Sequence, residues 1–261
     1  MEALRAGRDE VLSVVGSLSD DEWAAASDCA GWRVQDVVAH MANTFRSVVE
    51  PGSGPPGGNT GSLEKTQDAW VAAQKDWSPA KVLSEYEDLS ARGLEALAGL
   101  QAPGIGETVI PIEDAGQYPL HLVANALAFD HFCHLRNDVL RPNGPVDRTL
   151  PDPDDVRLGA TLEWLLAGLP QMPGAAITKA VDRPITLRLD GPAGGTWTLA
   201  PGPDGVAVTE GAAPDAAATI ASTTPEFVLW ATRRRPWRDR DLKVDGDTEY
   251  AARVLDAIHL F

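Results

Sequence analysis

The spacing of apolar residues changes near residue 174, and this change limits the chain to two structural parts. Before that point, apolar residues recur every three or four positions, the period of an amphipathic helix. After it, short segments alternate apolar and polar residues between Gly, Pro and Asp turns, which is typical of half-buried antiparallel strands. We therefore expect a helical bundle over 1–172 and a small α+β domain over 180–261. The run LPQMPGAA (169–176) has linker chemistry and places the boundary between Leu169 and Ala180.

Local signals define the helices of the first part. The sequence Ser19-Asp20-Asp21-Glu22 predicts a capping box, and Ser78 followed by Pro79 predicts a helix start. The segment Glu50–Ser62 is too rich in Gly and Pro for a regular element, so it forms either a lid or a plain surface loop. The expected long helices cover about 2–15, 34–49, 63–76, 79–99, 117–140 and 152–169.

The second part has the alternating pattern of four strands, ITLRLD, TWTLAP, GVAVTE and ATIAST. Thr224-Pro225 opens a helix, LKVDGD resembles a last strand with its turn, and TEYAARVLDAIHLF is a closing amphipathic helix. This order of elements predicts an α+β domain with its own core.

The charge balance excludes some partners. The chain carries 22 Lys and Arg against 38 Asp and Glu, a formal net charge of −16. Such a field repels nucleic acid and anionic membrane surfaces, so we expect neither as partner. No apolar run reaches the roughly 18 residues of a membrane span, and the N-terminus has no signal-peptide pattern. Two cysteines form no disulfide framework, which favours a reduced, cytoplasmic location. Both a monomer and a homodimer remain open.

Three residues on two expected helices have the types and spacing of a metal site. Asp130 and His134 are four residues apart and therefore share one helix face, while His40 lies among Val37, Val38 and Met41 on another helix. Two imidazoles and a carboxylate are a ligand set of catalytic zinc, with a fourth position left for water or substrate. Spacing alone also allows a chance pair and an ordinary hydrogen-bonded core histidine. His131 points about 100° away from Asp130 and suits a surface or second-shell position.

Two motifs resemble a known family. CAGWRVQDVVAHM (29–41) is similar to the C-x-G-W-x-V-x-D-V-V-A-H-L signature of the mycothiol-dependent maleylpyruvate isomerase family. FDHFCHLRNDV (129–139) resembles the branch of that family that reads D-x-W-x-H-E-x-D-I. The resemblance implies a DinB-like, metal-binding four-helix bundle followed by a sterol-carrier-like domain. It also implies that His40, Asp130 and His134 hold a divalent metal, expected to be zinc.

This sequence departs from the family pattern at four positions. Asp130 stands where other members carry Glu, Phe132 replaces Trp, and Leu135 stands where Glu is frequent. Arg33 occupies the place of a capping Ser or Thr, so the cap is lost or is replaced by Asp36. We expect the metal site to survive these changes and the substrate preference to be affected by them.

The resemblance implies an enzyme that uses mycothiol, with the metal holding the thiol as a nucleophilic thiolate. Addition to a cis alkene, rotation and expulsion would give cis-trans isomerisation, and the same apparatus could transfer the thiol instead. The substrate would be a small electrophile, expected to be anionic. Two alternatives share the site: a non-catalytic module that binds metal or a hydrophobic ligand, and a metal-dependent hydrolase of thiol conjugates.

The remaining candidates are assigned less directly. Arg234 and Arg238 are the predicted substrate-side residues, although their cluster could equally be a solvated one that offsets nearby acids. Asn43 and Arg46 follow His40 by about one and two turns and are the predicted cofactor-binding residues, with a solvent-facing Asn43 as the alternative. Cys29 and Cys133 are expected to be small packed residues rather than nucleophiles. Trp23 and Trp32 are expected to anchor the loop before Trp32 in the core.

Overall fold

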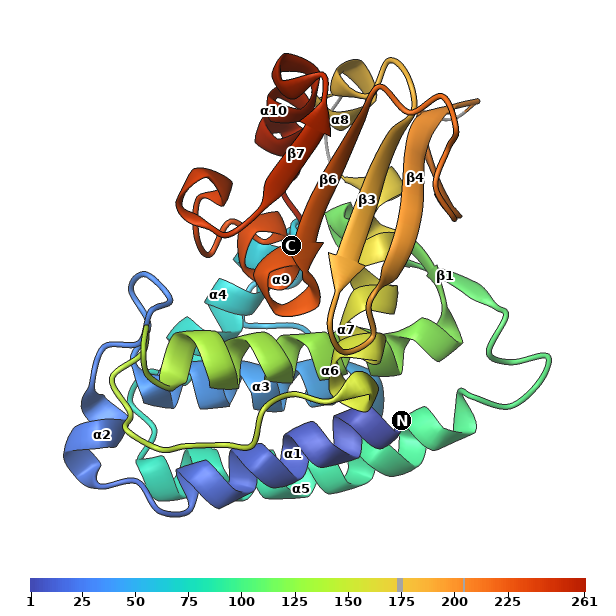
Figure 1. Cartoon of the computed structure of the whole chain (residues 1–261). Helices are drawn as coiled ribbons and strands as arrows, with labels where there is room; N and C mark the ends of the chain where they lie inside the picture. Colours follow the sequence, from blue (N-terminus) through green and yellow to red (C-terminus); the bar gives the residue numbers. More distant parts are fainter. Residues whose placement is uncertain (173–175, 204) are drawn as a thin grey trace. The chain divides into compact units, whose positions relative to one another are not determined.

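The computed structural model describes residues 1–172, 176–203 and 205–261. It divides into two compact units, Met1–Asp152 and Pro153–Phe261, shown in Figure 1. The first unit is largely helical and the second contains a mixed sheet, which confirms the predicted fold class. Helix α7 (Asp155–Gly168) belongs to the second unit, whereas the sequence-based boundary assigned that segment to the bundle. Part of the predicted linker, 173–175, lies outside the described residues.

Four long helices form the bundle of the first unit. Helix α3 packs on α5 and α6, and α1 packs on the same two helices, so each helix has two neighbours (Figure 1). The apolar face of α3 is fully buried at Val37, Val38, Met41 and Phe45. The helices of this unit are α1 (Glu2–Val15), α2 (Asp20–Ala24), α3 (Val34–Val49), α4 (Leu63–Ala73), α5 (Pro79–Gly99) and α6 (Val123–Cys133).

The helix starts follow the predicted caps. The Ser19 amide donates to Glu22 Oε2 (2.9 Å), and the Glu22 amide donates to Ser19 Oγ (3.3 Å), which completes the capping box. Before α3 the Arg33 amide donates to Asp36 Oδ2 (2.9 Å), so Asp36 satisfies the amide that precedes the helix. The start of α3, the helix that carries His40, is therefore retained without a capping hydroxyl.

The helix predicted over 117–140 is wrong at its beginning. Strand β1 (Val109–Ile112) pairs antiparallel with β2 (Gly116–Pro119), and α6 begins only at Val123. The β-branched residues of β1 form an antiparallel ladder with 116–119, and this hairpin pairing outcompetes helix propensity there. From His134 to Val139 the helix continues in the wider π form, which frequently occurs at functional sites.

The second unit contains the predicted strands in a five-stranded sheet of order β5-β4-β3-β6-β7. Strands β3 and β6 pair in parallel at its centre, and the other neighbours are antiparallel. Helix α9 packs on α7, β3 and β6, and α10 packs on α8, β6 and β7 (Figure 1). The bounds are α8 (Ala176–Ala180), β3 (Ile185–Asp190), β4 (Gly195–Gly202), β5 (Gly205–Glu210), β6 (Ala218–Thr223), α9 (Thr224–Ala231), β7 (Lys243–Gly246) and α10 (Thr248–Ala257).

None of the helices within 1–172, 176–203 and 205–261 is both long enough and apolar enough to cross a membrane.

Candidate metal centre

The bundle brings together the three side chains that the sequence proposed as metal ligands. His40 Nε2 lies 2.8 Å from Asp130 Oδ1, and His134 Nε2 lies 3.5 Å from the same oxygen. One donor atom from each of the three residues lies within 4.8 Å of the others. Donors at such separations can share an ion about 2.0–2.2 Å from each of them.

Two buried polar atoms of this group have no hydrogen-bond partner within the described part of the chain. They are Oδ2 of Asp130 and Nδ1 of His40, and the His40 residue is only 6% exposed. A buried carboxylate oxygen without a hydrogen-bond partner is costly, so Asp130 Oδ2 is free to contact a bound ion. A carboxylate and two imidazoles are donors that zinc accepts, so the residues present fit a bound zinc ion.

The two neighbouring imidazoles keep the Asp130 carboxyl ionised. Burial raises the pKa of the Asp130 carboxyl, but the imidazoles of His40 and His134 outweigh it and hold that pKa well below its usual range. Burial likewise lowers the pKa of His134, but its contact with Asp130 and its hydrogen bonds raise that pKa well above the usual range. The carboxylate is therefore anionic between two imidazoles.

Asp138 orients His134 from behind. Its Oδ2 lies 2.8 Å from His134 Nδ1, and the residue is only 2% exposed. A carboxylate that holds one imidazole nitrogen leaves the other nitrogen aimed at the metal and makes it a better ligand. The four-residue spacing from His134 to Asp138 repeats that from Asp130 to His134, and this repeat is the signal in the sequence that could have identified Asp138.

Trp32 covers the two imidazoles. Its ring centroid lies 5.1 Å from that of His40 and 6.2 Å from that of His134. The loop that carries it is closed by a bridge between Ala26 and Arg33, and Gly31 in that loop has φ +82. Trp32 therefore packs against the candidate ligands, whereas Trp23 lies buried in the core.

The predicted packed cysteines have different surroundings. Cys133 is 1% exposed, as expected for a packed residue. Cys29 is half-buried, and its Sγ lies 3.6 Å from His134 Nδ1. The sequence did not indicate this contact, because the loop and His134 are far apart along the chain.

Comparison with known proteins defines the family. The family model of the mycothiol maleylpyruvate isomerase N-terminal domain matches residues 4–137, slightly more than half of the chain. The chain belongs to the mycothiol maleylpyruvate isomerase family.

Solved structures agree with this membership at the level of the fold. Two crystal structures of the mycothiol-dependent maleylpyruvate isomerase, one of them a histidine-to-alanine mutant, align with TM-scores of 0.57 and 0.58. Each shares 13% sequence identity with this chain. The alignments cover 93–94% of this chain and 90% of the chain in each crystal structure. No curated protein matches the sequence.

His131 of this family member does not lie at the surface. It is 1% exposed, its Nδ1 lies 2.8 Å from the Leu127 carbonyl oxygen, and it packs against Phe45 and Tyr86. Burial lowers the pKa of His131 to about 4, so the side chain is neutral at pH 7. Of the two predicted positions, the surface one is wrong, because the side of α6 that carries His131 also faces the bundle interior. A position beside the candidate ligands stays a prediction, and His131 Nδ1 lies 3.8 Å from Asp130 Oδ2.

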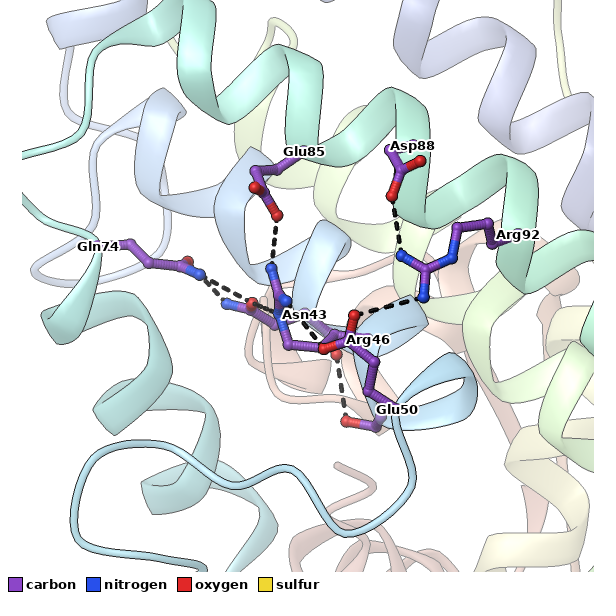
Figure 2. A network of polar contacts seen from close by, with 8 residues as sticks. Asn43, Arg46, Glu50, Gln74, Glu85, Asp88 and Arg92 are labelled. Carbon is purple, nitrogen blue, oxygen red and sulfur yellow. Dashed lines mark hydrogen bonds and ion pairs between the residues drawn. The ribbon is translucent and has the colours of Figure 1, made fainter.

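Asn43 and Arg46 belong to a polar network that joins α3 to α4 and α5 (Figure 2). Asn43 is fully buried, and its amide exchanges two hydrogen bonds with that of Gln74, at 2.9 and 3.0 Å. The Arg46 guanidinium forms ion pairs with Glu50 (3.1 Å) and Glu85 (2.6 Å). The polar groups of Asn43 and Arg46 therefore bond to other side chains of this chain. A cofactor-binding role for both residues stays a prediction.

Arg234 and Arg238 lie in the second unit, after α9. Arg234 is half-buried. Arg238 is exposed, donates to both carboxylate oxygens of Asp256 (2.6 and 2.9 Å) and lies over the Trp237 ring, 4.2 Å from its centroid. The assignment of both arginines to the substrate stays a prediction.

Proposed function

We propose that this chain is a metal-dependent enzyme that uses mycothiol for cis-trans isomerisation or thiol transfer on a small, electrophilic, anionic substrate. The observation that carries the proposal is that His40, Asp130 and His134 each bring one donor atom within 4.8 Å of the others, while Oδ2 of Asp130 is buried without a hydrogen bond in the described part of the chain. Three protein donors leave one coordination position for a ligand, as in catalytic zinc sites. Membership of the mycothiol maleylpyruvate isomerase family supports a low-molecular-weight thiol as that ligand.

Each side chain at the centre has a definite task in this proposal. Zinc bound there would supply a Lewis acid that keeps a coordinated thiol deprotonated near neutral pH. Asp130 contributes the negative charge that attracts the ion, and Asp138 holds the His134 ring so that Nε2 faces the same point. Trp32 covers one side of both imidazoles and keeps water away from them.

The second part of the proposal concerns the anionic substrate. Arg238 is the better candidate for binding it, because its guanidinium is exposed and already donates hydrogen bonds to a carboxylate, that of Asp256. A substrate carboxylate of the same chemistry can compete for that guanidinium. Arg234 remains its predicted companion, and Asn43 and Arg46 remain the predicted contacts for mycothiol.

Thermal unfolding of the zinc-loaded chain, with and without mycothiol, tests the proposal. Mycothiol should raise the unfolding temperature of the zinc-loaded protein and leave the metal-free protein unchanged. His40→Ala and Asp130→Ala should lose this response, whereas Asp88→Ala, an exposed change on α5, should keep it. A mycothiol response of equal size without zinc would refute metal dependence.

Further results separate the alternatives. Stabilisation by a lipid but not by mycothiol would identify a binding module. Hydrolysis of mycothiol conjugates with no requirement for free thiol would identify a hydrolase. Consumption of free mycothiol, or its catalytic use in isomerising a cis-alkene acid, would support the proposed enzyme and distinguish thiol transfer from isomerisation.

A further inference from the structure

Both ring nitrogens of His134 face potential metal ligands. Nε2 faces Asp130 and His40 in the candidate centre described above. Nδ1 lies 2.8 Å from Asp138 Oδ2 and 3.6 Å from Cys29 Sγ. These last three residues form a second group whose donor atoms all lie within 4.8 Å of one another.

The fold holds this second group in place through the backbone. The loop before α3 carries Cys29, and the Asp28 amide of that loop donates to the Asp138 carbonyl oxygen (2.9 Å). The Cys29 amide in turn donates to Ser27 Oγ (3.2 Å). Asp138 and His134 lie four residues apart on the π-helical segment. The thiol, the imidazole and the carboxylate are thus positioned by two segments that are hydrogen-bonded to each other.

We propose that Cys29, His134 Nδ1 and Asp138 form a second divalent-metal site, suited to a thiophilic ion such as zinc. A thiolate, an imidazole and a carboxylate are a zinc donor set, and the thiolate disfavours magnesium and calcium. Cys29 is half-buried and leaves the ion a route from solvent, while Asp138 is buried behind it. Binding breaks the hydrogen bond between His134 and Asp138 and releases the Nδ1 proton and the Cys29 thiol proton to solvent. With both groups loaded, the His134 ring would bridge the two ions as an imidazolate. The site does not depend on mycothiol.

Cobalt titration of the metal-free, full-length chain in thiol-free buffer tests the site. A cobalt ion bound to a cysteine thiolate gives a sulfur-to-metal charge-transfer absorption in the near ultraviolet. We expect this absorption in the wild type and in His40→Ala, which disables only the first centre. Cys29→Ala should abolish it, whereas Cys133→Ala, which removes the other thiol, should retain it. The bound cobalt should be about two equivalents in the wild type and about one in His40→Ala and in Cys29→Ala, by analogy with one ion for each three-ligand set.

The outcomes separate this site from the first centre. The inference would be overturned if neither the wild type nor His40→Ala gave the thiolate absorption while circular dichroism showed both proteins to be folded. That result would leave the proposed function intact. Equal absorption in Cys29→Ala would overturn it as well. Absorption in His40→Ala together with no cobalt bound to Cys29→Ala would support the second site and remove the first centre.

Discussion

At the scale of single residues, three side chains on one face of α6 and its π-helical continuation form most of the candidate site. Asp130, His134 and Asp138 follow one another at intervals of four, so an imidazole lies between two carboxylates. The Asp130 carboxylate contacts His40 and Nε2 of His134. The Asp138 carboxylate contacts Nδ1, on the other side of the His134 ring. Side-chain type alone therefore does not define a ligand, because two aspartates with equal spacing have different neighbours.

The role of Asp138 can be measured directly. We expect Asp138→Ala to weaken zinc binding at the first centre about 10- to 100-fold, because His134 loses the group that orients its ring. Competition with a chelator, carried out in a Cys29→Ala background to silence the second group, gives the affinity. Asp88→Ala is the matched control on an exposed helix face. Unchanged affinity in Asp138→Ala would show that the ring needs no such support.

The lowered pKa of the Asp256 carboxyl predicts how its contribution to stability depends on pH. Hydrogen bonds from Arg238 and then Trp237 lower the pKa of Asp256 from 3.8 to about 2. Because the folded-state pKa is lowered, its contribution to stability is present above pH 3.8 and is lost as the pH falls towards 2. An NMR titration of the carboxyl should show the low midpoint, and Arg238→Gln should shift it upwards. A ligand that recruits Arg238 should shift it in the same direction, and a midpoint near 3.8 in the wild type would contradict the pairing.

At the scale of elements, the close approach of α5 to α3 shapes the bundle around the site. A Cβ added to Gly93 of α5 would lie 2.4 Å from Cδ1 of Phe45 on α3. The Phe45 ring also packs against Tyr86 and His131, so it has little room to yield. A glycine in mid-helix lowers helix propensity, and here the close packing of two helices requires it.

Two glycine variants test this packing. Gly93→Ala should lower the free energy of unfolding by about 1–3 kcal/mol, because overpacking exceeds the gain in helix propensity. Gly99→Ala, at the end of the same helix with nothing within 4 Å of the added Cβ, should be neutral or stabilising by up to about 1 kcal/mol. Chemical denaturation of the two variants gives the comparison. If both proved equally stable, the contact would not limit the helix spacing.

At the scale of the whole molecule, the candidate metal donors found among the described residues all lie in the first unit, Met1–Asp152. Saturation with zinc therefore stabilises that unit directly. At a free zinc concentration of about 100 times the Kd, binding at one site raises the free energy of unfolding of that unit by about 2.7 kcal/mol. The sheet of the second unit contributes none of the described donors.

Hydrogen exchange of the intact chain can locate this effect. Zinc should slow exchange in α3 and α6, by up to about 100-fold for amides that exchange through opening of the unit, and leave the strands β3 to β6 unchanged. His134→Ala, which removes the residue common to both groups, should show no zinc response in either unit. Equal slowing of the sheet would show that the two units open together.

The sequence by itself determined the local features of this protein. The 3.6-residue period, the caps at Ser19 and Ser78 and the alternating strands depend on neighbours within a few positions, and they were predicted from those neighbours. The i,i+4 spacing of Asp130 and His134 and the family motifs likewise named the three residues that converge at the candidate centre.

Only the tertiary structure decided what depends on segments distant in the chain. The fold buried His131 and paired Asn43 with Gln74, 31 positions away. It also brought the thiol of Cys29 to His134, 105 positions away. The physical reason is that a local period records which side of an element is apolar, whereas a site depends on which sides the packing brings together.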